Sequence, residues 1–137
     1  MQTNNNKAIV QRFNKEVIAE GNLQSFLELM HPAFINHTAA PGMDKGAQGV
    51  LNTFNNILRP AMPDMQVIIY DQVAEGDLVT TRKAITGTHT GPLLGVPATG
   101  KTITIQVIDI VRLREQQYYE HWGINTLSAV VAQLAQA

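Results

Sequence analysis

The sequence has no cysteine, only 15% charged residues and no long apolar run, and each shortage excludes a class of protein. Without cysteine there is neither a disulfide nor thiol chemistry, which fits a reducing compartment. The formal net charge is −1 at pH 7 and is carried by scattered residues, so no basic face for nucleic acid is expected. No apolar run approaches the roughly 20 residues that a membrane-spanning helix needs.

The amino terminus also lacks the pattern of an export signal, because MQTNNNKAIV has no cationic stretch followed by an apolar core. We therefore expect a cytoplasmic protein that binds neither nucleic acid nor a membrane. What the chain does have is 45% apolar residues in a length of 137 residues. These values predict one globular domain, residues 1–137, with a substantial buried core.

Apolar residues recur at helical spacing in the first part of the chain and alternate as in strands in the second part. The predicted elements of the first part are a helix at 4–20, a short helix capped by Asn22 and ended by His31-Pro32, a strand at 34–37, and a helix capped by Asp44 and ended by Pro60 and Pro63. The second part predicts strands at 65–73, 78–89, 101–113 and 117–124, and then a last helix capped by Asn125 or Thr126.

Helices followed by a run of long strands indicate an α+β fold. The simplest arrangement is a strongly bent antiparallel sheet with helices packed on its concave face. Such an arrangement encloses a cavity between the sheet and the helices. Polar residues that face this cavity are the candidates for chemistry.

Asp109 lies in the otherwise apolar row of the strand 101–113. Since side chains alternate across a strand, it points the same way as Val107 and Val111, toward a core or a cavity. Burial raises the pKa of a carboxyl group and a nearby cation lowers it. Asp109 is thus a candidate general acid or base, or alternatively a structural residue tied to a backbone amide, a tyrosine or an arginine.

The stretch 118–125 offers further candidates at the end of the last strand. By parity, Tyr119, His121 and Gly123 share one face of this strand. His121 can exchange protons near neutral pH. Trp122 is either an apolar wall for a pocket or plain core.

Two further histidines, His37 and His89, lie near the ends of other predicted strands. No close His-x-His or His-x-x-x-His pair occurs, so no metal site is expected. The chain also has neither a Gly-x-Ser-x-Gly nucleophile motif nor a glycine-rich phosphate motif. The candidate residues therefore favour acid–base chemistry.

Several motifs follow one another along nearly the whole chain. They are Phe34-Ile35-Asn36-His37 with Pro41-Gly42, Val79 and Arg82 leading into Gly87-Thr88-His89-Thr90-Gly91, Leu94-Gly95-Val96-Pro97-Ala98-Thr99-Gly100-Lys101, Ile108-Asp109-Ile110, and Glu120-His121-Trp122. In kind and order they resemble the SnoaL-like polyketide cyclases and ester cyclases of the nuclear-transport-factor-2-like superfamily. The resemblance implies a cone-shaped α+β barrel with a closed apolar pocket. It also implies a cyclase, isomerase or lyase that removes a proton from a small apolar carbonyl compound without a cofactor.

Many members of that family carry an acidic residue directly after the tryptophan and another three places after it. Here these positions are Gly123 and Asn125. The remaining candidates for a catalytic pair are Asp109 as the base and His121 as its partner or acid. The predicted ligand pocket comprises His37, Arg82, His89, Tyr119, Trp122 and Asn125.

Two other functions stay open, a non-catalytic module that holds an apolar ligand in the same pocket and a dimeric scaffold. An enzyme needs an ionisable pair within hydrogen-bond reach beside space for a ligand, whereas a binding module needs only the space. A homodimer is expected in each case. The outer face of the last strands carries Ile108 and Ile110, and exposed apolar patches often mark interfaces.

Overall fold

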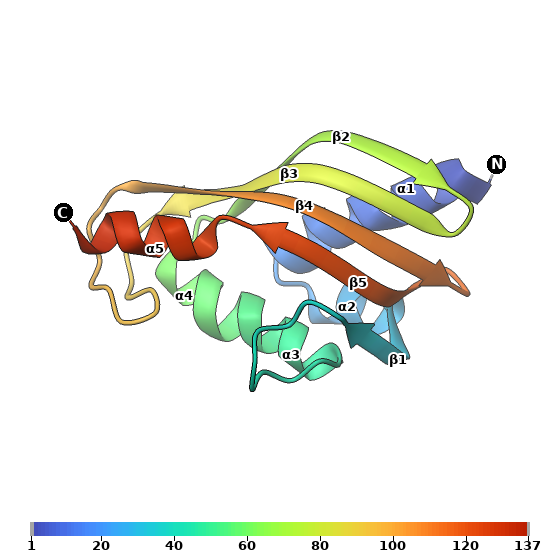
Figure 1. Cartoon of the computed structure of the whole chain (residues 1–137), viewed down its shortest axis with the longest axis horizontal. Coiled ribbons are helices and arrows are strands. Elements are labelled where there is room, and N and C mark those ends of the chain that lie inside the picture. Colours follow the sequence, from blue (N-terminus) through green and yellow to red (C-terminus); the bar gives the residue numbers. More distant parts are fainter. Residues whose placement is uncertain (1, 137) are drawn as a thin grey trace.

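The computed structural model describes residues 2–136, so the two terminal residues of the predicted domain lie outside it. Five strands form one sheet in the spatial order β1 (Met30–Asn36), β5 (Gln117–Asn125), β4 (Thr102–Arg114), β3 (Leu78–Thr88) and β2 (Gln66–Glu75). The sheet bends, and helices pack against its inner side (Figure 1). This arrangement confirms the predicted α+β class, although the sheet stays open between its edge strands β1 and β2.

Four of the strands pair as predicted, since β2, β3, β4 and β5 are antiparallel neighbours. The edge strand β1 differs because it runs parallel to β5. It also begins at Met30, earlier than predicted, because the helix before it ends at Leu29. Pro32 is compatible with this position, since an edge strand leaves one row of backbone N–H groups without a partner strand.

The helical layer consists of α1 (Gln2–Arg12), α2 (Leu23–Leu29), α3 (Ala47–Leu51), α4 (Arg59–Ala61), α5 (Leu127–Ala135) and two π-helical segments, η1 (Phe13–Ala19) and η2 (Asn52–Leu58). The first predicted helix is confirmed as α1 continued by η1, and Asn22 caps α2 by accepting a hydrogen bond from the backbone N–H of Ser25. No helix within residues 2–136 is both long and apolar enough to cross a membrane.

Two of the predicted helix ends are wrong. Asp44 does not cap α3. Its side chain instead accepts a hydrogen bond from the backbone N–H of Gly46, and the helix begins at Ala47. Pro60 does not end a helix: it lies within the continuous helical run of η2 and α4, which ends at Ala61, two residues before Pro63.

The core lies between the inner face of the sheet and the helices. On β4 the buried row is Ile103, Ile105, Val107, Asp109, Val111 and Leu113, as alternation predicts, with Val107 only partly buried. Phe13 of η1 stacks on Tyr118 of β5 with ring centroids 4.0 Å apart. Asp109 therefore belongs to the face that packs on the helices.

A β-bulge changes the alternation at the start of β5. Arg112 pairs with Glu120 and Leu113 pairs with Tyr118, so Tyr119 has no partner on β4. One extra residue shifts the side-chain parity on one side of the bulge. Tyr118 therefore points inward and is 5% exposed, whereas parity from the later residues predicted it on the opposite face from His121.

Candidate functional site

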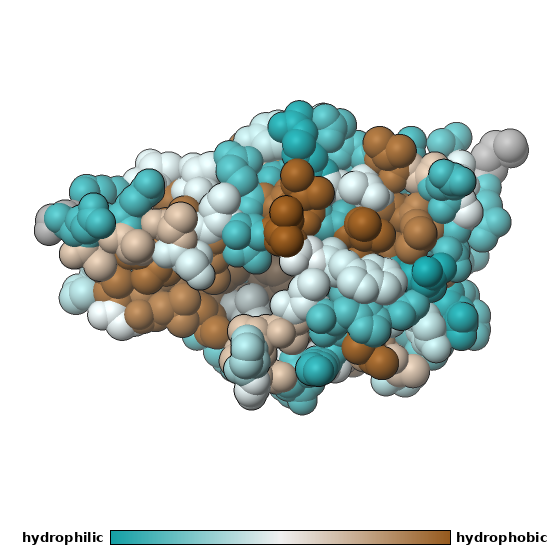
Figure 2. Space-filling view, viewed as in Figure 1, coloured by the Kyte–Doolittle hydropathy of each residue, from teal (hydrophilic) through white to brown (hydrophobic). Residues whose placement is uncertain are grey.

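A cavity of about 160 Å³ lies between the inner face of the sheet and the helical layer. Its wall is mostly apolar and includes Phe13 of η1 and Phe54 of η2. Figure 2 shows the surface hollowed between the strands and the helices, with apolar residues beside the hollow. Asp109, His121 and Asn125 from the sequence predictions lie in this wall.

Asp109 is the acidic residue of the cavity and is 6% exposed. Its Oδ2 atom lies 3.3 Å from Nε2 of His121 and 3.4 Å from Nζ of Lys83. Within residues 2–136 its second oxygen, Oδ1, has no hydrogen-bond partner. One oxygen of the carboxylate is thus held by two partners, while the other is buried without one.

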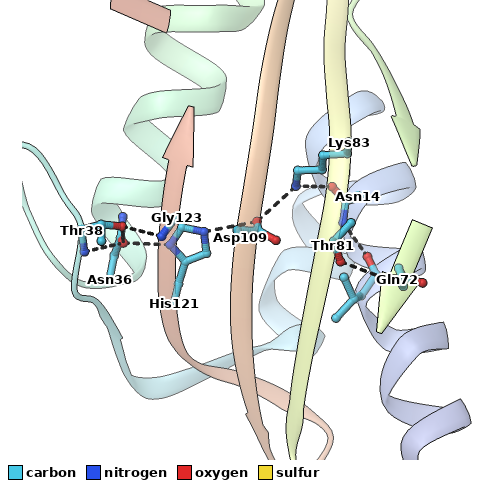
Figure 3. Close-up of polar contacts among 10 residues, drawn as sticks. Asn14, Asn36, Thr38, Gln72, Thr81, Lys83, Asp109, His121 and Gly123 are labelled. Atoms are coloured by element: carbon cyan, nitrogen blue, oxygen red, sulfur yellow. Dashed lines mark hydrogen bonds and ion pairs between the residues drawn. The ribbon is translucent and has the colours of Figure 1, made fainter. Parts of the chain in front are cut away.

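His121 is held by β1 on one side and by β4 on the other (Figure 3). Its Nδ1 atom lies 2.9 Å from Oδ1 of Asn36. The same Asn36 atom accepts hydrogen bonds from the backbone N–H and the hydroxyl of Thr38, both at 3.2 Å. Because a backbone N–H only donates, that Asn36 atom is the carbonyl oxygen, and Nδ1 of His121 must carry the hydrogen.

The proton on the other ring nitrogen depends on Asp109. An ionised carboxylate can only accept, so Nε2 of His121 donates to it only when the ring is a cation. A neutral ring would instead accept from a protonated Asp109. The contact therefore holds one proton between the two side chains, which is the arrangement that acid–base chemistry requires.

Lys83 adds a second cation to the cavity. Its side chain is 5% exposed, and its Nζ atom donates to Oδ1 of Asn14 at 2.5 Å. Asn14 is itself fixed, because its Nδ2 atom donates to the backbone carbonyl of Val10 at 2.8 Å. A continuous polar chain thus runs from η1 through Lys83, Asp109 and His121 to β1 (Figure 3).

Opposing effects set the pKa of Asp109. Burial is the largest of them and raises the pKa, but the charge of Lys83 and the contact with His121 together outweigh it, so the pKa lies below its ordinary value. Asp109 is therefore ionised at neutral pH. Burial, followed by the negative charge of Asp109, raises the pKa of Tyr118 well above its ordinary value, so its phenol stays neutral.

Gly123 faces Asp109 across the β4–β5 pair and makes room for the His121 ring. A Cβ atom at this position would lie 2.9 Å from Cε1 of His121, 3.2 Å from its Nε2 atom and 3.2 Å from Cβ of Asp109. Its backbone N–H donates to the hydroxyl of Thr38 at 2.9 Å. The position after Trp122 thus supplies space for the pair instead of an acidic group.

Trp122 and His37 lie on the outer side of the sheet, which corrects the prediction that they line the cavity. Trp122 pairs with Ile110, and residues directly opposite in a sheet share a face. The ring of His37 stacks on Trp122 with centroids 4.9 Å apart, and its Nε2 atom lies 2.8 Å from Oε2 of Glu120.

Arg82, Tyr119 and His89 also lie away from the cavity. Arg82 is on the outer face, where it forms an ion pair with Asp71 at 2.9 Å. The bulge turns Tyr119 outward onto the guanidinium group of Arg114, 4.0 Å from the ring centroid. His89 is fully buried beside the loop that follows β3, and its Nδ1 atom contacts the Thr99 hydroxyl at 2.9 Å.

Three polar residues of the site were missed by the sequence predictions, although alternation contained a signal for each. Lys83 follows Val79 and Thr81 in the inward row of β3, and Asn36 follows Phe34 in the inward row of β1. Asn14 lies on the same helical stripe as Val10 and Val17.

Within residues 2–136 no group of three His, Asp or Glu side chains converges as a metal ion would require.

The chain belongs to the SnoaL-like polyketide cyclase family, whose model matches residues 8–134. Among solved structures, IdmH from Streptomyces antibioticus, described as a candidate polyketide cyclase, has 29% sequence identity and a TM-score of 0.81, with 94% of this chain and 97% of that chain covered. A candidate polyketide cyclase from Acidithiobacillus ferrooxidans has 28% identity and a TM-score of 0.81, with 97% and 96% covered.

TsrD from Streptomyces laurentii has 23% identity and a TM-score of 0.83, with 97% of this chain and 96% of that chain covered, and supports the fold alone. No curated protein matches the chain. Membership of the family suggests a cyclase or isomerase activity that needs no cofactor.

Proposed function

We propose that this protein is a cofactor-independent acid–base enzyme of the cyclase or isomerase type, acting on a small, mostly apolar carbonyl compound. The observation that carries the proposal is the contact of 3.3 Å between Asp109 and His121 in the wall of an apolar cavity. Such a pair beside space for a ligand is what distinguishes an acid–base site from a plain pocket. Family membership agrees with this type of reaction.

In the proposed reaction Asp109 takes a proton from the carbon next to a carbonyl group. The carboxylate of Asp109 accepts this proton, and its buried Oδ1 atom has no other partner among the described residues. The protonated His121 ring, which stays paired with Asp109, offsets part of the negative charge that forms on the carbonyl oxygen. An ionised carboxylate with a pKa below the ordinary value is a weak base, so the reaction suits substrates whose C–H bond is already acidic.

A non-catalytic binding module is the second candidate, and the lowered pKa of Asp109 is the observation that favours it. The general bases of enzymes usually have a pKa closer to the working pH. The same cavity then holds an apolar ligand, and the polar chain serves to orient it. The two candidates differ in turnover and not in binding.

The test is product formation from a panel of small enolisable ketones and β-keto esters, with the wild type and Asp109→Asn compared at several pH values. The variant keeps the shape of the side chain but cannot accept the proton, so turnover should fall by ~100- to 10,000-fold. Asp71→Asn, which changes an exposed carboxylate paired with Arg82, is the matched control and should retain turnover. Tight ligand uptake without turnover by the wild type would favour the binding module.

We also propose that a second copy of the chain covers the outer face of β4 and β5. Ile108, Ile110 and Ile124 on this face are 45%, 37% and 71% exposed. Burial of such a patch favours association. Ile108→Lys should shift the protein to monomers in sedimentation experiments, and a wild type that sediments as a monomer at micromolar concentration would contradict the dimer.

A further inference from the structure

The cavity contains an uneven set of charges. Its titratable lining residues are Lys83, Asp109, Tyr118 and His121. Tyr118 stays neutral because burial raises the pKa of its phenol. The charge of the cavity is therefore set by one carboxylate, one amine and one imidazole.

The hydrogen-bond pattern makes the imidazole a cation while Asp109 is ionised. The Nδ1 atom of His121 must donate because it faces the carbonyl oxygen of Asn36. The Nε2 atom must donate because it faces the carboxylate of Asp109. With Lys83 also protonated, the cavity holds two positive charges and one negative charge.

One positive charge is thus left without an opposite charge inside an apolar cavity. Side-chain exposure is 5% at Lys83, 8% at Asp109 and 24% at His121, so water reaches the imidazole but screens Lys83 and Asp109 little. A charge that is buried without a partner costs considerable free energy, and proteins normally pair it. Within residues 2–136 the remaining lining residues are uncharged, so the missing negative charge must come from outside the chain.

We infer that the ligand of this cavity carries a negatively charged oxygen and that Lys83 is the residue that binds it. The inference rests on the proposed function for the position of the ligand and adds its charge and its partner. An enolate, an ionised 1,3-dicarbonyl compound and a carboxylate share this chemistry. In each case the apolar body of the ligand occupies the wall formed by side chains such as Phe13, Phe54 and Ile105.

The geometry leaves Lys83 free to make this contact. An ammonium group has three hydrogens, and the structure gives Nζ two partners, Asn14 at 2.5 Å and Asp109 at 3.4 Å. The contact with Asp109 exceeds the usual length of a charge-assisted hydrogen bond. A ligand oxygen can therefore approach Nζ and leave Asp109 paired with His121.

The test compares three ligands of similar size by isothermal titration calorimetry. They are 1,3-cyclohexanedione, which is ionised at neutral pH, cyclohexanecarboxylate, and the neutral cyclohexanone. Wild type should bind at least one anion about 10- to 100-fold more tightly than the ketone, because one hydrogen bond between charged groups separates them. The two anionic arms distinguish an enolate site from a carboxylate site.

Lys83→Met should abolish this preference, whereas Lys101→Met, which removes an exposed lysine just before β4, should preserve it.

A second measurement needs no variant, since the enolate and the neutral enol of 1,3-cyclohexanedione differ in ultraviolet absorption. The bound ligand should show the enolate spectrum. Equal affinity for the ketone and both anions, or a bound neutral enol, would overturn the inference. Neither result would contradict the proposed proton transfer, which turnover of neutral ketones tests separately.

Discussion

The two faces of the β4–β5 pair each carry a network of charged side chains, and burial makes them chemically different. On the outer face, Arg112 bridges Asp77 at 2.7 Å and Glu120 at 2.8 Å, and Glu120 also contacts His37. Side-chain exposures there range from 24% to 42%. On the inner face, the carboxylate of Asp109 and the amine of Lys83 are more than nine-tenths buried.

This difference in exposure decides what each network can do. Exposed ion pairs gain little free energy, because water and salt screen them. In the cavity the same kinds of groups interact strongly and determine where a proton resides. Two adjacent residues, His121 and Trp122, thus belong to different systems, one suited to chemistry and the other to the surface.

The largest expected effect is the difference in turnover between substitutions of the two histidines that contact carboxylates. His121→Gln removes the side chain that shares a proton with Asp109, so turnover should fall by about 100-fold or more. His37→Gln changes the histidine of the outer network and should leave turnover unchanged. The measurement is initial rate against pH for both variants, and equal losses would contradict the separation of the two faces.

A methyl group at position 123 should give the next largest effect. Gly123→Ala places Cβ 2.9 Å from the His121 ring and 3.2 Å from Cβ of Asp109, so the ring must shift and its contact with Asp109 is disturbed. A displacement of about 1 Å from the productive geometry can reduce a rate by roughly 100-fold. The nitrogen-15 chemical shifts of the His121 imidazole should differ between the variant and the wild type, as the rate does. Ile124→Ala, which alters a 71% exposed neighbour in the same strand, should change neither.

Stability should depend on acid through Asp109 in a predictable direction. Its pKa is lower in the folded protein than the ordinary value of about 3.9, so ionised Asp109 stabilises the fold above that value. This stabilisation is lost as the pH falls through the lower, folded-state pKa. The difference in unfolding free energy between wild type and Asp109→Asn should therefore be constant above about pH 5 and diminish below about pH 4. Denaturant titrations across this range measure it.

The outer network should give the smallest effect. Contacts with His37 and then Arg112 outweigh the effect of desolvation and lower the pKa of Glu120, but its side chain is only half-buried, so water and salt screen its interactions. Glu120→Gln should lower the Tm by less than Asp109→Asn does at neutral pH. High salt should reduce the Glu120→Gln change further, because it screens exposed charges first. A larger drop for Glu120→Gln would mean that the outer pairs stabilise the fold more than the inner ones.

Alternation along strands predicted the inward direction of Asp109 and His121, because pleated strands have a fixed period of two residues. It failed at Tyr119, where a bulge adds one residue and reverses the parity. Alternation placed Trp122 on the opposite face of its strand from His121, so its inclusion in the predicted pocket disagreed with parity. His37 lies beyond the end of β1, where alternation gives no information. Sequence motifs shared with the family could not separate these cases.

Other features depend on contacts between distant parts of the chain. Asn14 and Lys83 are 69 residues apart, and the hydrogen bond between them arises only when η1 packs on β3. The lowered pKa of Asp109 follows from Lys83 and His121 on the two neighbouring strands, whereas burial alone predicts a raised value. Alternation predicts inward side chains, but only the assembled fold shows which of them are in contact.

The rate of deuterium incorporation from D₂O at the α-carbon of a β-keto ester, measured above the uncatalysed rate, tests the central claim most directly, because it reports proton removal without requiring the complete reaction. The wild type and Glu120→Gln should exchange at equal rates, since Glu120 lies in the outer network. Asp109→Asn should exchange ~100- to 10,000-fold more slowly. Equal exchange by the wild type and Asp109→Asn would contradict the assignment of Asp109 as the base.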